Sequence, residues 1–122
     1  MSDVACDLRV LSSDERASHL ALTSTLFADA TVEDTGAEIF VRLANRPGVV
    51  REAGAFIENE RRCCSFFRFE LRVDAQSVAL CFEGPAEARA AVNAALELAR
   101  EHQGEKLLHA VTDKTGFSFH LK

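Results

Sequence analysis

Two adjacent cysteines and a nearby carboxylate are the residues of this sequence with the most distinctive chemistry. Cys63 and Cys64 follow Glu60 by three and four positions. Residues at these spacings share one face of a helix, so Glu60 is expected beside both thiols. Thiolates bind soft and borderline ions, and Cu(I), Zn(II), Hg(II) and As(III) are the candidate ions here. The pattern predicts a soft-metal or metalloid site with both cysteines as ligands and Glu60 as a further ligand or a neighbouring base.

The geometry of neighbouring residues limits what the two thiols can do together. Adjacent Cα atoms lie about 3.8 Å apart, whereas a relaxed disulfide needs roughly 4.4–6.8 Å. A Cys63–Cys64 disulfide would therefore be strained, and it suits a redox switch better than a permanent cross-link. On a regular helix the two side chains diverge by about 100°, so they can grip one ion only where the helix unwinds. We expect this unwinding at Ser65.

Cys81 is the candidate for a third sulfur ligand. Strand alternation places it on the same side as Ala79 and Glu83, away from the apolar face of its hairpin. A register slip of one residue would reverse this orientation and bring Cys81 toward the pair. Both orientations stay open at this point.

Arginines surround the cysteine pair in the sequence, namely Arg61, Arg62 and Arg68. Their charge would lower the pKa of a neighbouring thiol and would balance a buried Glu60. Burial and the negative end of a helix act in the opposite direction, so the sequence leaves the thiol state open. Cys6 is assigned no role, and His19 is expected to be a solvated helical side chain.

Composition predicts one small α+β domain over residues 1–122. The net charge is −5 without a long basic run, so nucleic acid is not expected as a partner. No apolar stretch reaches the roughly 20 residues that span a bilayer, and the first residues do not resemble a signal peptide. We therefore expect no membrane contact and a cytoplasmic location, where all four cysteines would be thiols.

Hydrophobic periodicity predicts the elements around the cysteines. Helices are expected at residues 12–29, 49–64 and 85–102. Hairpins are expected at residues 31–43 and 67–82. The first 11 residues are expected to be loosely ordered. Residues 105–122 form a tail with a possible strand pair, in which Leu107–Thr112 fit either a strand or a helix. The predicted fold is an antiparallel sheet of two or three hairpins with three helices packed on one face.

Turn chemistry sets the expected strand registers. In the first hairpin, Thr35-Gly36 as a two-residue turn would place Val32 opposite Ile39. In the second, a four-residue connection would pair Val73 with Val78 and place Glu70 opposite Cys81.

The run from Glu60 to Leu71, E-R-R-C-C-S-F-F-R-F-E-L, resembles the signature E-R-R-C-C-P-F-x-x-F-E-L of a group of small bacterial proteins of unassigned function. The resemblance extends more loosely over residues 13–100. Ser65 stands where that group usually has proline. The resemblance implies a bacterial source and a loose association with heavy-metal handling, and it implies no established activity.

Three functions are compatible with these patterns. The first is a soft-metal or metalloid binding or sensing protein. The second is a thiol oxidoreductase or redox switch, with Cys63 or Cys64 as the nucleophile and the other as the resolving thiol. The third is a structural module that forms a homodimer through the outer sheet face, where Phe40 and Phe66 lie among charges of both signs. Whether the protein is an enzyme stays open.

Overall fold

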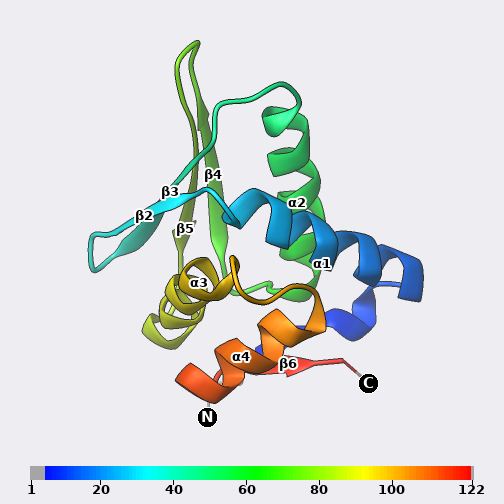
Figure 1. Cartoon of the computed structure of the whole chain (residues 1–122). Coiled ribbons are helices and arrows are strands. Elements are labelled where there is room, and N and C mark those ends of the chain that lie inside the picture. Colours follow the sequence, from blue (N-terminus) through cyan, green and yellow to red (C-terminus); the bar gives the residue numbers. More distant parts are fainter. Residues whose placement is uncertain (1–4, 122) are drawn as a thin grey trace.

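The computed structural model describes residues 5–121, which form an α+β arrangement (Figure 1). In chain order the elements are β1 (Ala5–Asp7), a short 3-10 helix (Leu8–Val10), α1 (Ser13–Phe27), β2 (Thr31–Asp34), β3 (Glu38–Leu43), α2 (Val49–Cys63), β4 (Arg68–Val73), β5 (Val78–Glu83), α3 (Ala86–Leu98), α4 (Glu105–Thr115) and β6 (Ser118–His120). None of the described helices combines the length and the apolar character needed to cross a bilayer.

The larger sheet is antiparallel, with the strand order β2-β3-β5-β4. The central strand β3 alternates between buried and more exposed residues, whereas residues 78–82 of β5 are all buried. One shared face of these two strands carries the core. That face contributes Ile39, Val41, Leu43, Val78, Leu80 and Phe82, all buried. The four side chains of the edge strand β2 are exposed, so the core lies over β3 and β5.

Two of the helices, α2 and α3, make the main contacts with the sheet. In Figure 1, α1 crosses in front of α2, and α4 lies against α3. The predicted α+β class is therefore confirmed. The prediction of three helices on one face is wrong in detail, because the described residues hold four α-helices, of which α1 packs mainly on α2 and α4 mainly on α3.

The first hairpin has a different register from the predicted one. Val32 pairs with Val41, and Asp34 pairs with Ile39. The backbone N–H of Thr35 donates to the carbonyl of Glu38 at 3.0 Å, so the turn is centred one residue later than expected. The shift moves the pairing by two positions, which leaves the predicted apolar face unchanged.

The second hairpin has the predicted register. Val73 pairs with Val78, and Glu70 pairs with Cys81. The connection is closed by Asp74, whose carboxylate accepts from the backbone N–H groups of Gln76 and Ser77 at 2.8 Å each. These hydrogen bonds stabilise the four-residue connection from which the register was predicted.

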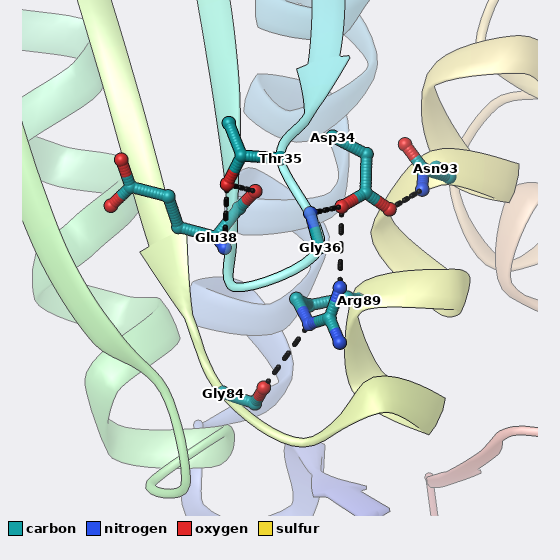
Figure 2. Close-up of polar contacts among 7 residues, drawn as sticks. All are labelled: Asp34, Thr35, Gly36, Glu38, Gly84, Arg89 and Asn93. Atoms are coloured by element: carbon teal, nitrogen blue, oxygen red, sulfur yellow. Dashed lines mark hydrogen bonds and ion pairs between the residues drawn. The ribbon is translucent and has the colours of Figure 1, made fainter.

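Asp34 ties the first hairpin to α3 (Figure 2). Its carboxylate accepts from the backbone of Gly36 at 2.9 Å, from Arg89 at 3.2 Å and from Asn93 at 3.1 Å. Arg89 also donates to the carbonyl of Gly84 at 3.3 Å. The Gly36 and Asn93 hydrogen bonds and the charge of Arg89 lower the pKa of Asp34. These contacts anchor α3 to the β2–β3 turn.

Both ends of the described chain differ from expectation. Residues 5–11, expected to be loose, form β1 and the 3-10 helix, with Cys6 and Leu8 buried. Residues 105–115 form α4, which is the helical alternative left open for residues 107–112. Within the described part of this tail β6 is the one strand, so the strand pair considered for the tail does not form. β6 runs parallel to β1 and places Phe119 opposite Cys6. This pairing joins segments more than 100 residues apart, so no local pattern reveals it; residues 1–4 and 122 lie outside the described residues.

The outer face of the sheet carries Phe40, whose ring is flanked by Arg42 and Arg72. Each guanidinium carbon lies 5.5 Å from the ring centroid. Such stacking partly covers the aromatic ring. The homodimer through this face stays a prediction.

Candidate thiol site

The end of α2 holds the predicted cysteine pair. Cys63 is the last helical residue, and Cys64 leaves the helix with φ −122° and ψ 67°. The Sγ atoms of the two residues lie 3.8 Å apart. The expected unwinding is therefore confirmed, one residue earlier than Ser65, and it lets the two side chains approach each other.

A third cysteine joins the pair, because Cys6 on β1 forms a disulfide with Cys64. Cys63 and Cys81 are free thiols, so the expectation of four thiols is wrong for the other two cysteines. The disulfide also replaces the Cys63–Cys64 bond considered above. Sequence reasoning missed Cys6 because its place depends on the β1–β6 pairing. The apolar spacing of Cys6 and Leu8, both buried, was the signal for an ordered segment.

Glu60 lies on the predicted face of α2, and its partner is a histidine of α1. The Nε2 atom of His19 lies 2.7 Å from Oε2 of Glu60. The imidazole is 2% exposed and stacks on Phe56, with ring centroids 5.3 Å apart. The prediction that His19 is solvated is therefore wrong. Within residues 5–121, its Nδ1 atom is buried without a hydrogen-bond partner.

The three arginines predicted around the site have exposed side chains. Arg62 donates to Glu15 at 2.9 Å and to the carbonyl of Val10 at 3.1 Å. Arg61 and Arg68 also lie on the surface. The structure thus brings His19 rather than an arginine to Glu60.

Cys81 lies away from the cluster. Its neighbours in the sheet are Phe40 on β3 and Glu70 on β4, on the face opposite the core. It is 2% exposed, and burial raises the pKa of its thiol. The strand alternation seen in the sequence is correct, and the structure leaves Cys81 out of the predicted ligand set.

The Cys63 thiol is held in its protonated form. Burial, followed by the nearby charge of Glu60, raises the pKa of Cys63 to about 12. Its S–H faces the backbone carbonyl of Glu60 at 3.8 Å. At neutral pH this thiol is therefore a weak nucleophile, and a bound soft cation would have to displace its proton.

Two overlapping groups of side chains have donor atoms close enough to hold one ion. One group is Cys6, Glu60 and Cys64, and the other is His19, Glu60 and Cys63. Within each group the donor atoms lie within 4.8 Å of one another. Glu60 belongs to both groups, so the site is continuous from β1 across the end of α2 to α1.

A cavity of about 60 Å³ adjoins this cluster. Its polar lining residues are Cys6, His19, Thr23 and Glu60. Its remaining wall is mainly apolar and includes rings and alanines from α2, α3 and β6. The thiol site therefore opens onto a small hydrophobic space.

The comparisons with known proteins give no relative from which a function could be taken. The chain matches no family model, and neither a curated protein nor a solved structure matches it. The function must be argued from the site itself.

Proposed function

We propose that the protein binds a thiophilic metal or metalloid ion through Cys6, Cys63 and Cys64 once the Cys6–Cys64 bond is reduced. The observation that carries the proposal is the convergence of three sulfur atoms from two distant segments, with the Glu60 carboxylate beside them. Soft thiolates favour soft ions, and trivalent arsenic accepts three of them. In a bacterial cytoplasm, where we propose the protein works, cellular thiols would supply the reduction.

The binding reaction with arsenite requires no oxidant. Three thiols and As(OH)3 give one arsenic trithiolate and three waters, so each thiol proton leaves with a hydroxide. Glu60 is the group best placed to accept a thiol proton and pass it on, with His19 hydrogen-bonded behind it. A carboxylate in this position speeds the replacement of hydroxide by thiols that burial keeps protonated.

Thiol–disulfide exchange is a second candidate, favoured by the 3.8 Å between Cys63 Sγ and Cys64 Sγ. Attack by Cys63 on Cys64 would form a Cys63–Cys64 bond and release Cys6 as a thiolate. The raised pKa of Cys63 opposes this attack at neutral pH. Metal binding must displace the same proton, but the bond between a soft ion and the thiolate supplies free energy for that displacement. We therefore rank metal binding first.

The proposal is tested by native mass spectrometry of the reduced protein under anaerobic conditions. Arsenite, Hg(II), Cu(I) and Zn(II) are titrated into the wild type, a Cys63→Ala/Cys64→Ala variant and Cys81→Ala. We expect one-to-one adducts that the double variant loses and that Cys81→Ala retains, because Cys81 is a buried thiol outside the cluster. Equal uptake by all three proteins would refute a metal site at the end of α2.

A further inference from the structure

The shape and polarity of the cavity restrict what can occupy it. Its polar lining residues are Cys6, His19, Thr23 and Glu60, and the rest of its wall is apolar and includes Phe56 and Ala91. A single water needs roughly 10–15 Å³ and several polar partners. This cavity, of about 60 Å³, is larger than that and offers few partners on its apolar wall. A small hydrophobic group attached to a sulfur-bound atom fits this environment better than water does.

We propose that the ligand of the site is a trivalent arsenical carrying one small alkyl group, such as methylarsonous acid, CH3As(OH)2. Its arsenic is bound by Cys6 and Cys64, and its methyl group occupies the cavity. This inference rests on the proposed function, since it specifies the ligand of the same cluster.

The number of thiols supports this assignment. An alkylarsenical has two exchangeable bonds, because carbon occupies the third position, so it needs two thiols where arsenite needs three. The pair already within bonding distance is Cys6 and Cys64, and of these two Cys6 lines the cavity. Cys63 does not line it and is left over as the third ligand for inorganic arsenite.

The reaction balances in two steps. A small dithiol such as dithiothreitol first reduces the Cys6–Cys64 disulfide and is itself oxidised to its cyclic disulfide. CH3As(OH)2 and the two thiols then form two As–S bonds, and the two hydroxyl groups leave as water. No net oxidation of arsenic occurs.

His19 provides an independent indication of a ligand with a hydroxyl group. Its Nε2 faces Glu60, and when that nitrogen carries the proton, Nδ1 is an acceptor. Within the described residues this buried Nδ1 has no donor, although the ring lines the cavity. The arsenical still carries one hydroxyl after the first thiol has reacted, and that hydroxyl can donate to Nδ1. His19 is therefore a positioning residue for the half-reacted ligand.

Cavity size gives the sharpest test. A cavity of roughly 150 Å³ accommodates benzene. The present cavity, at about 60 Å³, should accept methyl and exclude phenyl. Affinities of methylarsonous acid, phenylarsonous acid and arsenite are measured on the reduced, anaerobic protein by competition with a dithiol chelator. We expect wild type to bind the methyl compound more tightly than the phenyl compound.

Two variants separate the cavity from the sulfur ligands. Ala91→Leu fills the cavity, so the methyl group of the ligand can no longer be buried there. We expect the affinity for methylarsonous acid to fall about fivefold, which corresponds to the burial free energy of roughly one methyl group, while the affinity for arsenite stays within about twofold. Cys63→Ala should do the opposite, with arsenite weakened about tenfold or more and the methyl compound little changed. Ala55→Leu, at an exposed position of α2, is the matched control. Retained arsenite binding shows that the Ala91→Leu variant is folded. If that variant does not bind arsenite, Ala95→Leu, at another position lining the cavity, is used in its place.

The outcomes distinguish the two proposals. If the wild type binds neither an arsenical nor Hg(II), Cu(I) or Zn(II), the proposed metal-binding function fails, whereas binding of one of these metal ions without any arsenical overturns the inference alone. If arsenite binds normally but Ala91→Leu leaves methylarsonous acid unaffected, or phenyl binds as tightly as methyl, the inference fails alone. Loss of the methyl compound in Cys63→Ala would likewise overturn the assignment to Cys6 and Cys64.

Discussion

His19 Nε2 lies 2.7 Å from Glu60 Oε2, and this pair joins α1 to α2 beside the thiol cluster. A carboxylate on the apolar face of a helix is costly unless a partner answers it. The imidazole supplies that partner while Phe56 covers its ring. The hydrogen bond from His19 therefore lets the Glu60 carboxylate lie beside the three sulfur atoms without being buried unpaired.

Replacing Glu60 by Gln should slow arsenite binding without unfolding the protein. The amide can keep a hydrogen bond to His19 but cannot accept a thiol proton, so we expect the rate of arsenite binding, measured by stopped-flow mixing, to fall at least roughly tenfold. Glu58→Gln, an exposed carboxylate of the same helix, is the matched control. Identical binding rates of the two variants would remove Glu60 from the site.

His19→Ala should destabilise the fold. It removes the hydrogen bond to Glu60 and the stacking on Phe56, and we expect a loss of about 1–3 kcal/mol in the free energy of unfolding. Urea denaturation measures this loss. His102→Ala, on a partly exposed histidine after α3, should change stability much less. Equal effects would mean that His19 has no special structural role.

The raised pKa of Cys63 predicts an unusual pH profile for alkylation. In native, oxidised Cys81→Ala protein, the rate of iodoacetamide labelling at Cys63 should rise about tenfold per pH unit through pH 9 without a plateau, because the thiolate forms only near the pKa of about 12. In denaturant the same thiol should level off around its ordinary pKa of 9.0. A native plateau at or below pH 9 would show that Cys63 is not held protonated.

The Cys6–Cys64 disulfide should contribute strongly to stability. It closes a loop with a sequence separation of 58, for which chain entropy gives about 4 kcal/mol. We expect dithiothreitol to lower the denaturation midpoint of wild type and to have no effect on Cys6→Ala. Equal denaturation midpoints for reduced and oxidised wild type would show that the disulfide does not constrain the unfolded chain.

The Asp34 contacts predict an acid-dependent loss of stability. The lowered pKa of Asp34 means that its stabilisation is present above the unfolded-state value, near 3.8, and is lost as the pH falls through the lower folded-state pKa. Asp34→Asn should therefore be less stable than wild type at pH 7, and the difference should shrink below about pH 4. Asp113→Asn, on an exposed residue of α4, should show no such convergence.

The parts of the fold that local patterns determine were predictable. The helix over residues 12–29 was indicated by its cap, and Ser12 and Glu15 indeed form a reciprocal capping box. The second hairpin and the approach of Cys63 to Cys64 were also predicted, because each depends on residues within a few positions. The first hairpin's register was not, since both Thr35-Gly36 and Gly36-Ala37 are plausible turn centres.

The missing parts of the site depend on contacts between distant segments. Cys6 lies on β1, whose place depends on its pairing with β6. Local spacing left residues 107–112 open between strand and helix, and the packing of α4 on α3 accompanies the helical form. His19 looked like an ordinary surface residue because its burial comes from α2 packing on α1. Sequence spacing identified two of the three sulfurs and the carboxylate, and the tertiary fold supplied the rest.

The attachment of β1 has a kinetic consequence. This strand pairs with β6 through three residues, so the disulfide from Cys6 to Cys64 is the strongest link between β1 and the rest of the fold. Amide protons of β1 and β6 should therefore exchange through local opening that speeds up when the bond is cut, whereas those of β3 and β5 should follow global unfolding. Because the same sulfurs bind the proposed ligand, an arsenical bridging Cys6 and Cys64 would slow this opening again, and the amide exchange rates of β1 and β6 would report whether the site is occupied.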